Sequence, residues 1–492
     1  IDTIVVNVSA TGTNDAPVDL ALSGTVIPAG ATHPFTIGTL TVTDPDDTDG
    51  FSFTVADADG NPVSDLQVVH TGGNPGAYEL RTTGSGPVSL PAAVTITVTD
   101  SGGASYSEEF PVTLPVELRD AGGDLIASFA NLKAAVDYAN ADSGTDFSIH
   151  LASGDIDIGG HVVIEKNISI VGQGMGQTAL HADFDTGSDH NADSGALIVV
   201  AAGFTGNFSD FDIDGTGHKV TIAIRHLGNG TVDEVHFANI IYGPSAGTGI
   251  SVRGNADVDV LNSVFTNIGR IGAHFRDADV VGLFQGNHYT GKGAGNHLEY
   301  AAEAGGGAEV AFIDNFVTEN LGQVNPLDTS AGFLVTTYFG LGTEVTFTGN
   351  TVENSYEGVA IGYPVIGPSG VPDESTVTFG SGNDFTENVE TGVTVVGNAV
   401  VTGTDGVDGT FDWTGAGGDN EPSGADLSDT LRGGDGDDDL TGFGGDDTLD
   451  GGAGNDMAHY AASLDAADIV PNGAGGWTVT TGGEGTDTLS DI

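Results

Sequence analysis

The sequence contains no cysteine, few basic residues and no apolar segment long enough to cross a membrane. None of its 492 residues is cysteine, so disulfide bonds cannot stabilise any part of the chain. Lys and Arg number 11 against 70 Asp and Glu, which gives a formal net charge of -59. This charge excludes nucleic acids and anionic membranes as partners for most of the surface. The short apolar runs exclude membrane insertion, and Ile1 does not begin a signal peptide.

The excess of carboxylates itself predicts bound cations. Carboxylates at this density repel one another and destabilise a compact state unless counter-ions neutralise them. Calcium prefers oxygen ligands, so we expect several bound calcium ions and a stability that depends on calcium or salt.

A nine-residue unit recurs four times over residues 424–459. The units read GADLSDTLR, GGDGDDDLT, GFGGDDTLD and GGAGNDMAH. The sixth position is always an aspartate: Asp429, Asp438, Asp447 and Asp456. The eighth is apolar: Leu431, Leu440, Leu449 and Ala458. Glycine permits tight turns with positive φ, and aspartates that face one another from successive turns need a cation between them. Further candidate ligands lie in the same units: Asp435, Asp437, Gly433, Gly442 and Gly451.

This glycine-rich nonapeptide resembles the RTX repeat, GGxGxDxUx. The third unit of this chain departs from it, because Phe443 stands in place of the second glycine. Proteins with this repeat form a parallel β-roll with calcium in its turns, and one coil takes two units. The resemblance implies that Asp429 pairs with Asp447, and Asp438 with Asp456. A disordered acidic linker is the alternative, but the strict register of four units argues against it.

The RTX resemblance also implies a location outside a bacterial cell. RTX proteins leave bacteria in one step by a C-terminal signal, which agrees with the missing signal peptide at Ile1. We therefore expect a secreted or cell-surface protein cut from a longer polypeptide, with residues 460–492 capping the roll.

The N-terminal part is expected to be a β-sandwich. Residues 3–8 alternate like a strand, the linker TGTNDAPV follows, and short strands with turn signals continue to about residue 114. The linker resembles junctions between VCBS or cadherin-like modules of bacterial surface proteins, which implies a spacer or adhesive role. Four acidic loop residues are candidate calcium ligands: Asp44, Asp46, Asp57 and Asp59. Solvated loops are the alternative.

The central part is expected to be a right-handed parallel β-helix. Apolar residues at helical spacing predict one helix over residues 129–141, and strand-like segments follow. This opening resembles the capped start of pectin-lyase-like β-helices. The later coils align on TIAIR, GISVR, GAHFR, NHLE, GFLVT and GVAIG, which turns Asn296 and Leu298 inward. Four asparagines at one turn are expected to stack: Asn287, Asn315, Asn350 and Asn383.

The alignment places Arg225, Arg253 and Arg276 in one outward column, followed by Glu299, with His274 and His297 beside it. Adjacent strands lie about 4.8 Å apart, so stacked arginines form a positive strip. Guanidinium binds carboxylates and sulfates bidentately, which favours an acidic polysaccharide as the ligand. The alternative is that each arginine pairs with a nearby carboxylate.

Two functions follow from these features. We favour a calcium-stiffened surface or adhesin-type protein whose β-helix presents a binding face. The alternative is a polysaccharide lyase or epimerase that abstracts the C5 proton of a uronic acid. Its candidate catalytic residues are Arg253, Arg276, His274, His297 and Tyr300. Whether the protein is an enzyme stays open, since no compact signature of a pectate lyase, alginate epimerase or polygalacturonase is recognisable.

The expected organisation has five segments. Residues 1–14 end a preceding module, 15–115 form the cadherin-like sandwich, 116–412 the β-helix, 413–459 the calcium roll and 460–492 its cap. The protein is therefore expected to be all-β with one short helix.

Overall fold

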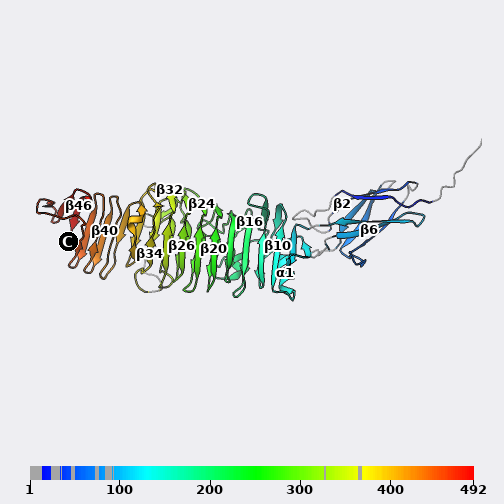
Figure 1. Cartoon of the computed structure of the whole chain (residues 1–492), viewed down its shortest axis with the longest axis horizontal. Coiled ribbons are helices and arrows are strands. Elements are labelled where there is room, and N and C mark those ends of the chain that lie inside the picture. Colours follow the sequence, from blue (N-terminus) through cyan, green and yellow to red (C-terminus); the bar gives the residue numbers. More distant parts are fainter. Residues whose placement is uncertain are drawn as a thin grey trace, which may run out of the picture. The chain divides into compact units, whose positions relative to one another are not determined.

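The computed structural model describes residues 14–23, 34, 36–45, 50–72, 77–83, 91, 93–112, 114–325, 328–363, 368 and 370–492. The chain divides into two compact units, Ile1–Asp157 and Ile158–Ile492 (Figure 1). Strands dominate both units, as predicted. The predicted strand at residues 3–8 lies outside the described residues, and the five segment boundaries stay predictions.

The first unit contains a β-sandwich of two antiparallel sheets. One sheet has the order β1-β2-β5-β4, with β1 Asp19–Leu22, β2 Thr36–Thr43, β4 Leu66–Gly72 and β5 Ala77–Thr82. The other has the order β3-β6-β7, with β3 Ser52–Ala56, β6 Ala93–Thr99 and β7 Ser105–Pro111. Alternate residues of β6 are buried with Leu40 and Leu80 in one apolar core. The predicted sandwich is therefore confirmed.

A helix and four further strands complete the first unit. They are β8 Val116–Asp120, β9 Leu125–Phe129, α1 Leu132–Ala141, β10 Asp146–Leu151 and β11 Gly154–Asp157. The predicted helix starts later than residue 129 because Phe129 ends β9. Asn131 then caps the helix, since its Oδ1 accepts the N–H of Ala134 at 2.9 Å.

The second unit is a parallel β-helix, as predicted, whose coils follow one another in Figure 1. Its sheet 1 contains β12 (Val162–Ile164), β15 (Ala196–Val200), β17 (Ile222–His226), β19 (Thr248–Arg253), β22 (Ile271–Arg276), β25 (Tyr300–Gly305), β30 (Ala331–Thr336), β33 (Glu357–Ile361), β36 (Thr391–Val396) and β39 (Phe411–Thr414). Each of these strands pairs in parallel with the next.

Sheet 2 of the β-helix consists of shorter parallel strands. They are β13 (Asn167–Val171), β14 (Thr178–His181), β16 (Gly206–Asp214), β18 (Gly230–Ala238), β20 (Asp257–Leu261), β21 (Val264–Thr266), β23 (Val281–Gln285), β24 (His288–Thr290), β26 (Glu309–Ile313), β27 (Phe316–Thr318), β31 (Glu344–Thr348), β32 (Thr351–Glu353), β34 (Thr376–Phe379), β35 (Asn383–Asp384), β37 (Val400–Thr402) and β38 (Val407–Asp408). The short strands β28 (Gln323–Asn325) and β29 (Asp328–Thr329) form a separate pair, and two short 3-10 helices span Asp193–Gly195 and Thr404–Gly406.

The interior of the β-helix is filled by stacked side chains. Phe347 stacks on Phe312 and on Phe379, with ring centres 5.0 and 5.3 Å apart. At one turn, Asn287 Nδ2 donates to Asn315 Oδ1 at 3.1 Å, and Asn315 Nδ2 donates to Asn350 Oδ1 at 2.8 Å. Asn350 Nδ2 in turn donates to Asn383 Oδ1 at 3.1 Å. The predicted asparagine stack is therefore confirmed.

The strand register differs from the predicted alignment in two coils. Arg225 pairs with Ser251, so β17 and β19 are offset by two residues from that alignment. The strand after β22 is Tyr300–Gly305 instead of residues 296–299, and Asn296 is exposed instead of inward. The first shift is two residues and the second is six, since Arg276 pairs with Gly305 instead of Glu299. An even shift preserves the alternation of inward and outward side chains, so the sequence pattern could not reveal it.

Sheet 1 continues from β39 into the C-terminal roll. The roll and its cap contain β40 (Thr430–Asp435), β41 (Asp439–Leu440), β42 (Thr448–Ala453), β43 (Met457–Ala458), β44 (Ile469–Pro471), β45 (Trp477–Thr481) and β46 (Gly485–Ser490). Leu431 pairs with Leu449, and Leu449 with Leu489, so β46 extends the apolar column of the repeats.

Candidate functional site

The sixth-position aspartates of the repeats pair as the sequence predicts. The N–H of Asp429 donates to Asp447 Oδ1, and the N–H of Asp438 donates to Asp456 Oδ1, each at 2.9 Å and across 18 residues. Asp447 continues this pattern to Asp487 at 2.9 Å, a residue that the sequence analysis missed. The signal was present in the segment GTDTL, whose aspartate and leucine have the spacing of the repeat.

The carboxylate oxygens of these aspartates fit calcium. Asp438 Oδ2 and Asp447 Oδ2 are buried and have no hydrogen-bond partner among the described residues. Burial raises the pKa of Asp429 to about 6 and that of Asp447 to about 7, because the charged carboxylate loses its hydration. Within the described ranges no group of three or more His, Asp or Glu side chains is suited to one metal ion. Calcium would therefore be held by paired aspartates together with backbone carbonyl groups.

The first-position glycines leave space for these carboxylates. A Cβ atom on Gly433 would lie 2.2 Å from Asp438 Oδ2, and one on Gly442 would lie 2.1 Å from Asp447 Oδ2. On Gly451 it would lie 2.5 Å from the Cβ atom of Asp456. These three glycines are therefore required by close packing, whereas the left-handed φ belongs to their neighbours Gly434 and Gly452.

The other predicted ligands of the roll lie at its surface. Asp435 and Asp437 are exposed, and Asp437 Oδ1 accepts the N–H of Asn455 at 2.9 Å. Phe443 adopts φ +64° at the position where the repeat has its second glycine. This left-handed conformation is unfavourable for a phenylalanine, so the third unit is the strained one.

The predicted calcium loops of the β-sandwich are less complete. Asp46 lies outside the described residues, and Asp44 lies half-buried just after β2. Asp57 Oδ1 accepts the N–H groups of Asp59 at 3.0 Å and Asn61 at 2.8 Å. These bonds give Asp57 a structural role in its own turn, and calcium binding in the sandwich stays a prediction.

Arg225 holds a loop instead of facing a ligand. Its Nε lies 3.1 Å from Asp193 Oδ1, and its terminal nitrogens donate to the carbonyl groups of His190 and Asn191 at 3.1 and 3.0 Å. Because Arg225 pairs with Ser251, the prediction that it shares one ladder with the other arginines is wrong.

Arg253 and Arg276 do lie side by side on adjacent strands. Arg253 Nε donates to Asp277 Oδ2 at 3.0 Å, so this arginine is ion-paired, as the structural alternative proposed. The guanidinium of Arg276 lies over the ring of Phe339, 3.6 Å from its centre. No free positive strip therefore exists along these three arginines.

Glu299 was expected to follow Arg276 in that column and His297 to lie beside it, but both precede β25. Glu299 is fully buried and accepts the N–H of Lys292 at 3.0 Å, while His297 Nε2 lies 3.3 Å from its Oε1. Glu303 occupies the position beside His274 instead. Burial raises the pKa of Glu299 to about 7, so its carboxyl group stays protonated to a higher pH in the folded protein than in water.

The raised pKa of Glu299 predicts a pH-dependent stability. The folded state binds the proton of Glu299 more tightly than the unfolded state does, so protonation of Glu299 stabilises the fold. This contribution to the free energy of unfolding is complete below about pH 4.5 and is lost as the pH rises through about 7, and it amounts to about 3 kcal/mol in total. Glu299→Gln should therefore raise the free energy of unfolding relative to wild type above pH 7 and change it little at pH 5. Denaturant titrations at fixed calcium measure this difference, with exposed Glu309→Gln as the control. A difference that does not change with pH would contradict the prediction.

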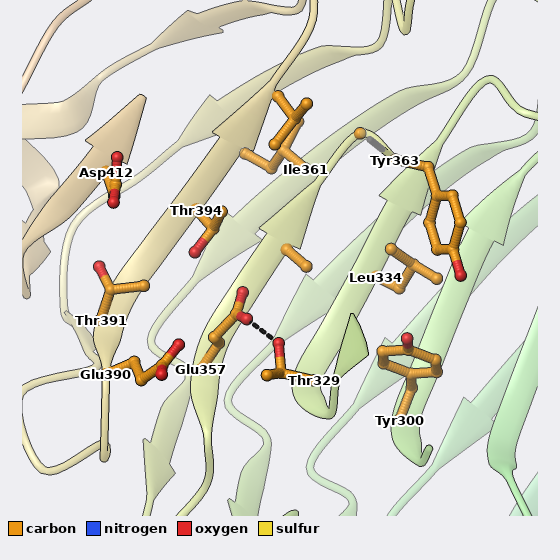
Figure 2. Close-up of a pocket in the computed structure, with 13 residues that line it drawn as sticks. Tyr300, Thr329, Leu334, Glu357, Ile361, Tyr363, Glu390, Thr391, Thr394 and Asp412 are labelled. Carbon is orange, nitrogen blue, oxygen red and sulfur yellow. Dashed lines mark hydrogen bonds between the residues drawn. The ribbon is translucent and has the colours of Figure 1, made fainter. Parts of the chain in front are cut away.

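A cavity of about 460 Å³ opens on the outer face of sheet 1 (Figure 2). Its floor follows one outward column in which Leu334, Ala360, Thr394 and Asp412 pair from strand to strand. Tyr300, predicted as a catalytic residue, lies on its wall. Three carboxyl groups line it: Glu357, Glu390 and Asp412.

Glu357 is the most buried of these carboxyl groups. It is 7% exposed and accepts a hydrogen bond from the hydroxyl of Thr329 (Figure 2). Burial raises its pKa, and the negative charges of Glu390 and Asp412 raise it further. Glu390 is exposed, and Asp412 makes an ion pair with Arg432 at 2.7 Å. Burial and the charge of Asp412 raise the pKa of Glu390 as well. The cavity therefore joins the nearly buried Glu357 to the exposed Glu390 and to Asp412, which is paired with a cation.

A smaller cavity of about 180 Å³ lies next to the first one and shares Leu334 and Tyr363 with it. Arg270 and Glu303 line this cavity, and Arg270 Nε is buried without a hydrogen-bond partner among the described residues. His274 Nε2 lies 3.6 Å from Glu303 Oε1. Burial and the surrounding arginines lower the pKa of His274 to about 3, while burial raises that of Glu303. The neutral imidazole of His274 therefore lies next to the buried carboxyl group of Glu303.

No pattern in the sequence had marked five residues of the two cavities: Glu357, Glu390, Asp412, Arg270 and Glu303. They come from different coils and share no local motif. The one available signal was that GVAIG, in the aligned set, directly follows Glu357. Only the strand pairing of sheet 1 brings these residues to one face.

Comparison with known families matches the C-terminal repeats. Residues 423–458 match the RTX calcium-binding nonapeptide repeat in four copies. These residues are RTX repeats. They bind calcium ions, as predicted, and such repeats are typical of secreted proteins. No helix in the described part of the chain is long and apolar enough to cross a membrane. No curated protein matches the sequence.

The similarity of this chain to solved structures is remote. The A-module of mannuronan C-5 epimerase AlgE6 from Azotobacter vinelandii matches with 15% identity over 67% of this chain and 91% of its own, at a TM-score of 0.35. The catalytic unit of an alpha-1,3-glucanase from Streptomyces thermodiastaticus matches with 14% identity over 98% of this chain and 96% of its own, at a TM-score of 0.37. Pectin methylesterase PemA from Erwinia chrysanthemi matches with 10% identity over 52% of this chain and 75% of its own, at a TM-score of 0.28. Scores this low say nothing about substrate or reaction.

Proposed function

We propose that this RTX protein is secreted, binds a polysaccharide along the outer face of sheet 1 and hydrolyses its glycosidic bonds. The observation that carries the proposal is Glu357, a nearly buried carboxyl of raised pKa on the wall of an open cavity. Clefts that contain titratable groups with shifted pKa values are the usual places of acid–base catalysis. Hydrolysis of a glycosidic bond needs one protonated and one ionised carboxyl group.

The residues of the cavity have distinct roles in this proposal. Glu357 gives its proton to the glycosidic oxygen as the bond from that oxygen to the anomeric carbon breaks. Glu390 or Asp412 accepts a proton from the water whose oxygen forms the new bond to that carbon. One water is consumed, and two shorter chains result. Three carboxyl groups would repel a polyuronate, so a neutral sugar is expected at this position.

The shape of the groove supports an extended ligand. Glu303 and Asp412 lie in one outward column and are separated by four strand spacings. At about 4.8 Å per spacing this is roughly 19 Å, a length that accommodates several sugar rings.

The proposal is tested by incubating the protein with dextran, laminarin, polygalacturonate and alginate and measuring new reducing ends. Glu357→Gln should lower the rate at least about 100-fold, because general acid catalysis contributes a factor of that order. Exposed Glu387→Gln is the control and should keep the wild-type rate. Equal rates for wild type and Glu357→Gln would refute the assignment. Retention on a polysaccharide without any cleavage would instead support the adhesin-type function.

The smaller cavity supports a second candidate, the lyase or epimerase reaction. His274, whose Nε2 lies 3.6 Å from Glu303 on the cavity wall, can accept the C5 proton of a uronic acid, and Arg270 can neutralise the uronate carboxylate, which makes this proton more acidic. This moves the reaction from the predicted arginine column to the groups around Arg270. Ultraviolet absorbance of an unsaturated product, or a changed uronate composition, would be lost in His274→Ala.

A further inference from the structure

Three aromatic side chains gather where the two cavities meet. Tyr338 and Phe339 lie on the loop after β30, and Tyr363 follows β33. The ring of Tyr338 contacts Phe339 edge-on, with centres 4.9 Å apart and planes at 82°. It contacts Tyr363 in the same way, at 5.7 Å and 66°. We call these three residues the aromatic platform.

Phe339 is held in place although much of it faces solvent. It is 43% exposed, which is unusual for a phenylalanine in contact with two other groups. One face of its ring is covered by the Arg276 guanidinium at 3.6 Å, and Tyr338 packs against it from the side. A guanidinium over an aromatic face attracts it electrostatically, so Arg276 orients the ring. The exposed part of the ring is therefore presented in a defined direction.

The loop that carries the platform is also ordered by hydrogen bonds. The N–H of Tyr338 donates to Thr336 Oγ1 at 2.9 Å, and Thr343 Oγ1 donates to the carbonyl of Thr336 at 3.0 Å. The N–H of Gly307 donates to Thr343 Oγ1 at 3.0 Å. An ordered loop loses little conformational freedom when a ligand binds.

The platform continues the groove of the proposed function. Tyr363 lines both cavities, while Tyr338 and Phe339 line the smaller one with Arg270 and Glu303. Apolar rings next to polar and charged groups match a sugar, which has an apolar C–H face and a polar rim of hydroxyl groups.

We propose that the aromatic platform is a sugar-binding subsite on which one ring of the polysaccharide stacks through its C–H face. The platform lies beside the acidic cavity, so the stacked ring is separate from the bond that Glu357 acts on. Arg276 is a positioning residue that keeps Phe339 oriented toward the sugar. The subsite rests on the proposed function only in that the ligand is a polysaccharide, since stacking itself requires no cleavage.

The subsite is tested by affinity electrophoresis in gels that contain dextran, laminarin, polygalacturonate or alginate. The parent protein is Glu357→Gln, so that cleavage does not disturb binding. Adding Phe339→Ala or Tyr363→Ala should raise the Kd for the retarding polysaccharide about tenfold, whereas Phe339→Trp should preserve it. Leu341→Ala is the matched control, because Leu341 lies on the same loop and is 50% exposed without belonging to the platform. Arg276→Ala should weaken binding, and Arg276→Lys should restore part of it.

The outcomes separate this proposal from the proposed function. Unchanged retardation with Phe339→Ala and Tyr363→Ala would overturn the platform, while a loss of cleavage in Glu357→Gln would still support hydrolysis. Retardation that depends on Phe339, in a wild-type protein that cleaves nothing, would overturn hydrolysis and support the platform. A parent protein that no polysaccharide in the panel retards would overturn both. Circular dichroism of each variant identifies any that fails to fold.

Discussion

Chelation of calcium should unfold the C-terminal roll before the β-helix. The roll keeps Asp438 Oδ2 and Asp447 Oδ2 buried without partners among the described residues, so its carboxylates need a cation to stay close together. Its apolar core is also thin, since each coil adds only residues such as Leu431 and Leu449. The β-helix contains stacked phenylalanines and hydrogen-bonded asparagines instead, and should remain folded.

Tryptophan fluorescence measures this unfolding selectively. The chain has two tryptophans, and Trp413 pairs with Leu431 while Trp477 pairs with Leu489. Both therefore border the apolar column of the roll. Titration with a calcium chelator should change their emission together, and limited proteolysis should then cut first after residue 424.

Variants of the repeat refine the same prediction. Gly433→Ala places a Cβ atom 2.2 Å from Asp438 Oδ2, so it should raise the calcium concentration needed for folding at least about tenfold. Exposed Glu421→Gln, just before the first unit, should leave that concentration unchanged. Emission and proteolysis that do not respond to chelation would contradict the calcium requirement of the roll.

Asn315→Ala should destabilise the β-helix by at least about 3 kcal/mol. Asn315 Oδ1 accepts from both the N–H and the Nδ2 of Asn287, and Asn315 Nδ2 donates to the carbonyl of Phe284 and to Asn350 Oδ1. Alanine leaves several of these buried groups without a partner, and each such group costs about 1 to 3 kcal/mol. Denaturant unfolding, followed by far-ultraviolet circular dichroism in excess calcium, measures the loss.

The matched control for this asparagine is Asn296→Ala. Asn296 is exposed on the loop before β25, so its removal should change the free energy of unfolding by less than about 0.5 kcal/mol. If both variants were equally stable, the asparagine stack would not contribute to the stability of the β-helix.

Local patterns in the sequence were sufficient to predict the repeats and the stack. The nonapeptide has a constant length, so the pairing of Asp429 with Asp447 follows as soon as two units make a coil. The asparagines have a single place in each coil, directly after a strand and at a turn, where their amides can bond to one another. Constant spacing and a specific chemistry leave one arrangement in both cases.

The functional face depended on information that the sequence does not contain. The coils of the β-helix differ in length, and an offset of two residues keeps every inward side chain inward. The sequence alone therefore predicted a ladder of three arginines, whereas the strand pairing separates Arg225 from Arg253 and puts Glu303 beside His274.

The sequence by itself determined the classes of structure and the calcium chemistry of the RTX repeats, because composition and repeats are local properties. Tertiary structure alone decided which charged residues meet on the β-helix. Glu357, Glu390 and Asp412 lie on separate coils, and their shared cavity exists only because parallel pairing places those coils side by side.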